Sequence, residues 1–366
     1  MPAPSQPRIH GGLPRGELRA LGLADDDIVD FSVSCNPYGP APVMIDAIRR
    51  APIDRYPDPA ASEAREALGA LLGVAIDRIA LGNGAAELLW TLAAVLVRPG
   101  TVVVVVEPTF CEWPAAAAHA GGELHAWRAR PDDGFAVDLD AVGRQIRDRG
   151  AAVAYVCAPA TPSGAAIPID ALRALAEAHP STTLVIDQSF LALSARFADA
   201  AIALPDNVVC VRSLTKDHAI PGVRVGYLLA APALVARLER ARASWTTGAP
   251  AQAAAIAACG ATGFVADSRG RLLAARAQLS TQLADLGLAP APSTTGFLVV
   301  RVDRRANTGD GPRTSAAALR HRLLAAHHLL VRDCASFGLP DHIRIAARSD
   351  ADTARLINAL RTELAQ

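Results

Sequence analysis

Lys216 is the residue of this chain best suited to covalent chemistry, because it is the only lysine. Every other member of the 36 Lys and Arg residues is arginine. Arginine can supply positive charge, but its guanidinium stays protonated and forms no imine. Retention of one primary amine therefore favours an enzyme that forms an imine with a carbonyl group. The alternative is one solvated lysine that survived by chance, and the neighbouring residues argue against it.

Two segments carry groups that bind phosphate. Ser213, Thr215 and Arg224 flank Lys216 with two hydroxyls and a guanidinium, which together can clamp an anion. The second segment, GNGAAE at 82–87, is a glycine turn that opens a helix, and free N–H groups at a helix start bind phosphate. Most such turns are plain helix starts, so the second segment indicates phosphate binding only in combination with the first.

Three more residues lie in or after predicted strands. Asp187 ends an apolar strand, where a carboxylate is well placed for a ligand in an α/β crevice. Phe110 follows another strand and could stack on a ring. Arg344 lies within the strand-like run HIRIA, where it is costly unless it pairs with an anion. Phe110 or Arg344 alone has an ordinary structural explanation, in the core or in an internal ion pair.

Taken together, an amine, a phosphate clamp, a carboxylate and a stacking aromatic describe a pyridoxal phosphate site. Lys216 would hold the aldehyde as an imine. Asp187 would keep the pyridine nitrogen protonated, so that the ring withdraws electrons.

The elements that must position these residues alternate between strands and helices. A valine-rich run at 101–107 shows no polar alternation, as expected of a strand buried on both faces. Similar runs occupy 153–157, 183–187, 208–212 and 225–229, and helical stretches such as 169–178 lie between them. This order predicts an α/β fold with a mainly parallel sheet covered on both faces.

After residue 232 the pattern changes. Helices are predicted through 232–245 and 250–285, strands at 297–302, 329–334 and 342–347, a polar loop at 304–313, and a final helix that ends near 364. These elements predict a smaller α+β domain.

Composition narrows the class of protein. The 366 residues are 51% hydrophobic, which is ample for a large core, and the formal net charge is 0 without a long basic run. Nucleic acid is therefore not an expected partner. No apolar run is long enough to span a membrane, and the N-terminus has no secretion signal. The six cysteines form no CxxC motif, so we expect a reducing cytoplasm without a disulfide framework or metal site.

Several motifs then identify a family. They are HGG at 10–12, DFSVSCNPYGP at 30–40, RYPDP at 55–59, GNGAAEL at 82–88, SLTKDHAIPGVRVGY at 213–227 and VRDCASF at 331–337. With them the chain resembles fold-type-I pyridoxal phosphate enzymes of the histidinol-phosphate aminotransferase and threonine-phosphate decarboxylase group, and the decarboxylase more closely. The resemblance implies an N-terminal arm (1–43) that packs with the small domain, a large cofactor-binding domain (44–245) and a small domain (246–366).

The resemblance also implies a role for each matching residue. The cofactor would be held by the turn at Gly84, the backbone N–H groups of Ala85 and Ala86, and the side chains of Phe110, Thr161, Asp187, Ser213, Thr215, Lys216 and Arg224. Tyr56 would reach the cofactor phosphate of a neighbouring subunit, which implies a homodimer. Arg344 would bind the substrate carboxylate, and His10, Asn36 and Arg332 would line the substrate pocket.

Some positions depart from the family pattern. Thr161 replaces an asparagine that donates to the cofactor, Phe190 a frequent tyrosine, and Leu13 an asparagine. Asp217 and His218 stand where aromatics are typical. The resemblance favours decarboxylation of threonine O-phosphate. The alternative is an aminotransferase, which Thr161 and Leu13 favour. A pyridoxal phosphate-binding regulator is a third class, disfavoured because no basic DNA-binding domain precedes the cofactor domain. An inactive scaffold is disfavoured by Lys216.

Overall fold

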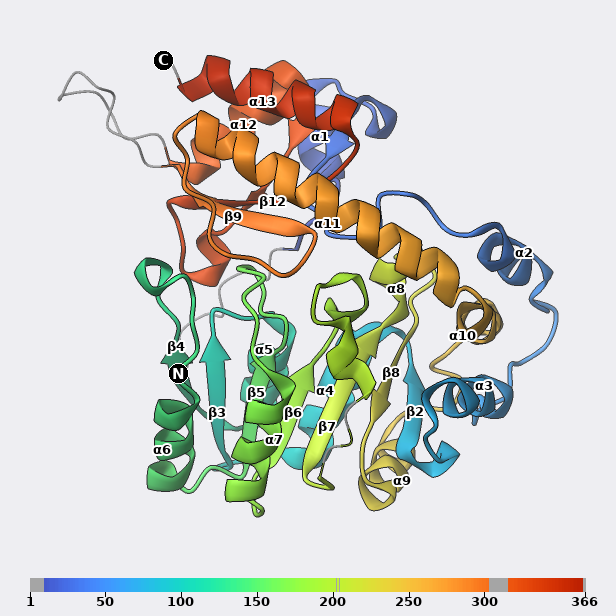
Figure 1. Cartoon of the computed structure of the whole chain (residues 1–366). Coiled ribbons are helices and arrows are strands. Elements are labelled where there is room, and N and C mark those ends of the chain that lie inside the picture. Colours follow the sequence, from blue (N-terminus) through green and yellow to red (C-terminus); the bar gives the residue numbers. More distant parts are fainter. Residues whose placement is uncertain (1–9, 202, 204, 303–314, 365–366) are drawn as a thin grey trace.

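The computed structural model describes residues 10–201, 203, 205–302 and 315–364, so the predicted polar loop at 304–313 lies outside the described residues. Figure 1 shows a large α/β unit with a smaller unit on top of it, and the long helix α11 (Thr262–Asp285) crosses from one to the other.

A seven-stranded sheet forms the large unit. Its strands are β2 (Ile79–Gly82), β3 (Val102–Glu107), β4 (Glu123–Arg128), β5 (Val153–Cys157), β6 (Thr183–Asp187), β7 (Val208–Ser213) and β8 (Gly226–Leu229), in the order β2-β8-β7-β6-β5-β3-β4. All neighbouring strands are parallel except in the two pairs that β8 forms, with β2 and with β7. The predicted α/β fold with a mainly parallel sheet is confirmed, and the five predicted strands match β3, β5, β6, β7 and β8 to within one or two residues at each end.

Helices cover both faces of this sheet. On one face, Val103 and Val105 of β3 pack in a cluster with α4 (Gly84–Leu96), α5 (Glu112–His119) and α9 (Pro232–Ala241). On the other face, Val104 and Val106 pack with α6 (Leu139–Arg149) and α7 (Ile169–Ala178). Successive side chains of a strand point to opposite faces, so a strand that is buried on both needs the unbroken valine run seen in the sequence.

The smaller unit contains the antiparallel sheet β11-β12-β9, made of β9 (Phe297–Arg301), β11 (Arg332–Asp333) and β12 (His342–Ala346). Helices α12 (Ala316–His327) and α13 (Asp350–Leu364) pack with it and with α11. The N-terminal segment joins this unit, because β1 (Val29–Asp30) pairs with β10 (Leu329–Leu330) and α1 (Arg15–Leu21) packs on α12 through Leu18. The strand predicted at 329–334 is thus divided between two sheets.

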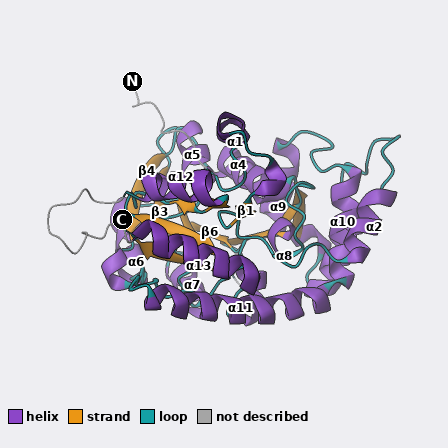
Figure 2. Cartoon of the chain, turned by 90° about the horizontal axis from the view of Figure 1, so that it is seen from above, coloured by secondary structure: helices purple, strands orange, loops and turns teal. Residues whose placement is uncertain are grey.

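A third group of helices flanks the edge strand β2. Helices α2 (Pro42–Arg50), α3 (Ser62–Leu72) and α10 (Ala249–Gly260) form one apolar cluster with it. The predicted helical stretch 250–285 breaks at Ala261, where α10 and α11 meet at a bend of 76°. Figure 2 shows α11 running along one side of the molecule towards α10. No single described helix is long and apolar enough to cross a membrane, and only the bent α10–α11 pair passes by length and composition.

Candidate active site

A cavity of about 160 Å³ opens at the carboxyl ends of the parallel strands, where ligands of open α/β sheets bind. The N-terminal segment and the small sheet supply its other walls. The predicted site residues that line it are His10, Phe110, Thr161, Asp187, Lys216, Arg332 and Arg344. Residues from four distant parts of the sequence therefore meet at one place.

Lys216 lies on α8 (Leu214–Asp217), a single helical turn that directly follows β7. Its Nζ atom lies 4.8 Å from the centroid of the Phe190 ring. Burial lowers the pKa of the Lys216 amine below that of a free lysine, against the opposing effect of Asp187. A larger fraction of the amine is then neutral and able to attack a carbonyl carbon.

Asp187 ends β6 and is buried, and both of its oxygens accept hydrogen bonds from the protein. The hydroxyl of Tyr155 donates to Oδ2 at 3.1 Å, and the backbone N–H of Ser189 donates to Oδ1 at 2.8 Å. Tyr155 comes from the neighbouring strand β5 and is itself fully buried. The orientation of the carboxylate is therefore fixed by the protein before any ligand arrives.

The start of α4 and the end of β7 lie side by side because Gly226 of β8 pairs with both Gly82 and Ser213. A Cβ atom on Gly84 would lie 2.4 Å from the Arg224 guanidinium, so only glycine lets this group approach the helix start. The side chain of Asn83 makes no capping hydrogen bond, which leaves the first N–H groups of α4, at Gly84, Ala85 and Ala86, for an anion.

Two hydroxyls complete this cradle. The Oγ of Ser213 and the Oγ1 of Thr215 lie 2.6 Å apart, and both side chains are buried. Two hydroxyls, a guanidinium and a helix start match the oxygen atoms of a phosphate group.

Arg344 of β12 is buried, yet it forms no ion pair with a described carboxylate. Its Nη1 donates to Thr161 Oγ1 at 3.1 Å and its Nη2 to the carbonyl of Ser32 at 2.9 Å. Its Nε has no hydrogen-bond partner among the described residues. Burial lowers the pKa of Arg344 to about 10. A desolvated cation with one unsatisfied donor is a place for a ligand anion.

Arg332 lies directly opposite Arg344 on the neighbouring strand β11, and both line the cavity. Its Nη2 donates to Ser336 Oγ at 2.7 Å, and its guanidinium lies 5.3 Å from the ring of Phe337. Two like charges on paired residues destabilise a sheet unless an anion lies between them.

His10 reaches the cavity from the N-terminal segment. Its Nε2 lies 2.9 Å from Oε1 of Glu112, a buried carboxylate whose Oε2 accepts from the indole of Trp90 at 2.6 Å. The His10 ring lies 5.7 Å from that of Phe110, which stands between β3 and α5. This chain of contacts holds the N-terminal segment against the large unit.

Two predicted residues lie elsewhere. The Asn36 side chain does not line the cavity, because its Nδ2 donates to the Asp217 carbonyl at 2.9 Å and so supports the end of α8. Tyr56 is 79% exposed and stacks on Trp245, with ring centroids 4.6 Å apart.

A model of the aminotransferase class I and II family matches residues 26–360. The chain belongs to this family. It is 34% identical over 364 residues to histidinol-phosphate aminotransferase 2 of Ralstonia nicotianae, which covers 97% of this chain and 94% of that protein.

Solved structures of aminotransferases and a decarboxylase share the fold. The histidinol-phosphate aminotransferase of Sinorhizobium meliloti, in complex with pyridoxal-5'-phosphate, aligns with a TM-score of 0.85 at 27% identity, over 96% of this chain and 95% of that one. The L-threonine-O-3-phosphate decarboxylase of Porphyromonas gingivalis aligns with a TM-score of 0.80 at 25% identity, over 93% and 100%. The protein is therefore a pyridoxal phosphate-dependent enzyme of the class I and II aminotransferase family.

The expected closer likeness to threonine-phosphate decarboxylase is not confirmed. Proteins that match nearly the whole chain at 31–34% identity are named histidinol-phosphate aminotransferases. The alternative reading, an aminotransferase, has the better support.

The residues present fit the cofactor of this aminotransferase family. The cradle at Gly84, Ser213 and Arg224 suits its phosphate, and the oriented Asp187 suits its ring nitrogen. Lys216, the only lysine of the chain, lines the same cavity as Asp187 and directly follows Thr215 of the cradle.

Sequence reasoning missed several residues of the site. Tyr155 reads as one more core aromatic in the strand VAYVC, and no local signal shows that its hydroxyl meets Asp187. Glu112 could have been noticed as an acid two residues after Phe110. Ser34 and Ser189 line the cavity with buried hydroxyls that have no partner among the described residues.

Proposed function

We propose that this enzyme transfers the amino group of an amino compound with an anionic end to a 2-oxo acid. The family match and the named relatives support an aminotransferase. The observation that carries the substrate class is the buried Nε of Arg344, which lacks a partner among the described residues and faces the same cavity as Lys216. Decarboxylation of threonine O-phosphate is the alternative hypothesis.

The roles of the protein groups follow from their positions. When bound, pyridoxal phosphate supplies an aldehyde for the substrate amine and a ring that withdraws electrons from its Cα atom. Asp187 would accept a hydrogen bond from the ring nitrogen and keep a proton there. Lys216 would act as the base that takes the proton from Cα of the substrate.

The way in which the protein holds the substrate carboxylate would decide between transamination and decarboxylation, because it sets which bond at Cα is placed to break. Arg344 lies at the Thr161 side of the cavity, and its fork of donors would hold the substrate anion there. A carboxylate held by Arg344 would be kept from leaving as CO2, so that the Cα–H bond would break instead. Arg332 is the candidate for a second, distal anion such as a phosphate.

Product analysis tests this proposal. The purified enzyme is offered histidinol phosphate, threonine O-phosphate and a panel of amino acids, each with and without 2-oxoglutarate. Transamination predicts glutamate formation that depends on the 2-oxo acid, without release of CO2. Release of CO2 from threonine O-phosphate in the absence of a 2-oxo acid would overturn the proposal in favour of decarboxylation.

We also propose a homodimer in which Tyr56 completes the partner's phosphate site, as the family resemblance implies. The exposed Tyr56–Trp245 stack supports this, because 79% of Tyr56 is uncovered in the single chain. Mixing inactive Tyr56→Ala and Lys216→Ala variants should restore part of the activity, because one hybrid site has both residues. An active monomer by light scattering would contradict it. A cytoplasmic location stays a prediction.

A further inference from the structure

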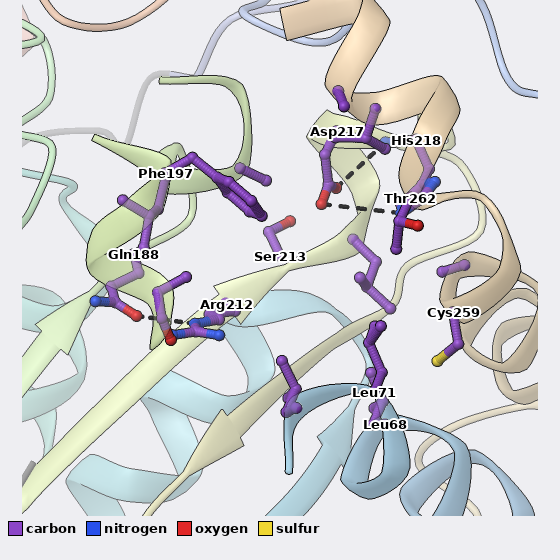
Figure 3. Close-up of a pocket in the computed structure, with 18 of the residues that line it drawn as sticks. Leu68, Leu71, Gln188, Phe197, Arg212, Ser213, Asp217, His218, Cys259 and Thr262 are labelled. Carbon is purple, nitrogen blue, oxygen red and sulfur yellow. Dashed lines mark hydrogen bonds and ion pairs between the residues drawn. The ribbon is translucent and has the colours of Figure 1, made fainter. Parts of the chain in front are cut away.

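A second cavity of about 540 Å³ lies behind the helical turn that carries the catalytic lysine. Figure 3 shows it between β7, the segment after β6, the start of α11 and the helix α3. Ser213, Leu214, Asp217 and His218 line this cavity, whereas Lys216 lines the active-site cavity. The turn α8 is therefore the wall between the two cavities.

Apolar side chains form most of the wall. Leu68, Leu71 and Leu72 come from α3, Leu191 and Phe197 from the segment after β6, and Val265 from α11. Leu71 is 46% exposed and Phe197 is 44% exposed, which is unusual for large apolar side chains in a concave site. An apolar ligand would remove this surface from water.

Two arginines give the cavity its charge. The Nε of Arg212 donates to Gln188 Oε1 at 2.8 Å, and its Nη2 to the carbonyl of Ala200 at 3.0 Å. The Nη1 of Arg269 donates to the carbonyl of Ala192 at 3.1 Å, and its guanidinium lies 4.2 Å from the centroid of the Phe197 ring. Neither forms an ion pair with a described carboxylate, so both guanidiniums keep their full charge towards the cavity.

The described lining contains one acid and two arginines. Among the described residues of the lining, Asp217 is the only acid, and its Oδ2 lies 4.0 Å from Nε2 of His218. Figure 3 shows this pair at the α8 end and Arg212 with Gln188 at the other. The lining as a whole thus favours an anion, and its apolar walls favour an apolar body on that anion.

We propose that this cavity binds a small monocarboxylate with an aromatic or aliphatic body, and that its occupancy changes the affinity of the active site for pyridoxal phosphate. The carboxylate pairs with Arg269, and the body packs on the leucines of α3 and on Phe197. Arg269 is the assigned partner because it lies on α11 beside the exposed Phe197 ring.

The second cavity and the cofactor site are coupled because α8, which separates them, is short. This turn has four residues, and Ser213 at its start lines the second cavity while its hydroxyl bonds that of Thr215 in the phosphate cradle. Its other end is held by Asn36, whose backbone N–H donates to the Lys216 carbonyl at 2.7 Å. A ligand that displaces Asp217 or Ser213 must therefore move Lys216 or the cradle.

Calorimetry with 4-phenylbutyrate tests the site, and 4-phenylbutan-1-ol serves as the uncharged probe of the same shape. We expect the acid to bind the holoenzyme and the alcohol to bind about tenfold or more weakly, because it cannot pair with a guanidinium. Arg269→Ala should weaken the binding of the acid by about 10- to 100-fold and leave the binding of the alcohol unchanged. Ala266→Trp, at an exposed position of the lining, should block both probes.

The matched control is Arg240→Ala, which removes an exposed arginine of α9 outside the lining and should leave both affinities as in the wild type. No binding of the acid to the wild type, or equal binding to Arg269→Ala, would overturn the site. These measurements need no turnover, so they stand apart from the proposed transamination.

Thermodynamic linkage between the two ligands tests the coupling between the second cavity and the cofactor site. If 4-phenylbutyrate changes the dissociation constant of pyridoxal phosphate by some factor, the cofactor must change that of 4-phenylbutyrate by the same factor. We expect a factor of about 5 or more, measured on cofactor-free and cofactor-loaded enzyme. Equal affinities in the two forms would overturn the coupling.

Discussion

The two ends of the active-site cavity differ in how completely the protein pairs their polar groups. At the cofactor end, both oxygens of Asp187 accept hydrogen bonds, from Tyr155 and Ser189. At the substrate end, Arg344 keeps an Nε without a partner among the described residues, and Arg332 lies directly opposite it. If Asp187 binds the cofactor, as proposed, its carboxylate can be fully oriented in advance, because the cofactor stays in place. If Arg344 binds the substrate, it needs a free donor each time a new substrate binds.

The largest effect expected is at the residue between the two ends. Lys216→Arg keeps the charge but removes the amine, so turnover should fall by about 1000-fold or more. Borohydride treatment of the wild-type holoenzyme should attach the reduced cofactor to one peptide, the one that contains Lys216. Mass analysis that places the adduct on any other peptide would break the comparison, because the cavity would not be the cofactor site.

The substrate end should be important for turnover and unimportant for stability. Arg344→Met would remove the proposed contact with the substrate anion, which should cost ~2–4 kcal/mol in kcat/KM, or roughly 30- to 1000-fold, for substrates with a carboxylate. The variant loses a buried cation that has no counter-ion, which stabilises the fold, but it also loses the hydrogen bonds to Thr161 and to the Ser32 carbonyl, which destabilises it. The two effects oppose each other, so the free energy of unfolding should change by less than about 1 kcal/mol. Urea unfolding of the cofactor-free protein measures it, and a larger loss of stability would contradict the prediction.

At the cofactor end, we expect a substitution to lower the stability of the fold as well as the activity. Asp187→Ala would remove the proposed charge-assisted hydrogen bond to the cofactor ring, worth ~2–3 kcal/mol, and activity should fall by about 30- to 150-fold. It also leaves the Tyr155 hydroxyl and the Ser189 N–H without their partner. The same urea experiment should therefore show a loss of about 1–3 kcal/mol. Equal stabilities of Asp187→Ala and the wild type would remove the distinction between the ends.

The same distinction limits what could be predicted from the sequence. Residues of the cofactor end lie next to strong local signals, such as the apolar strand before Asp187 and the single lysine after Ser213. The pairing of Tyr155 with Asp187 depends on the register between β5 and β6, in which Cys157 faces Asp187. Such a register is a property of two distant segments and leaves no local pattern.

Fold prediction was limited for similar reasons. Strands buried on both faces showed themselves as unbroken apolar runs, and β3, β5 and β6 followed directly. The edge strand β4 reads ELHAWR, with several charged or polar residues, and was not predicted. The break at Ala261 lies between Gly260 and Gly263 in an alanine-rich stretch, where helix propensity masks the bend that packing imposes.

The smallest effect concerns the proton of Lys216. Only the neutral amine attacks an aldehyde, and burial lowers the pKa of this amine, so its neutral fraction at neutral pH exceeds that of a free lysine. The rate of cofactor incorporation should therefore rise with pH, with a midpoint below pH 10.5, the pKa of a free lysine. Asp217 partly offsets the shift, since its negative charge favours the protonated amine. Asp217→Asn should move the profile to lower pH by less than about one unit, read from absorbance after mixing with pyridoxal phosphate.

Asp333→Asn, on β11, is the matched control and should leave the profile in place. A move to higher pH in Asp217→Asn would mean that Asp217 acts on Lys216 through the shape of α8 and not through its charge.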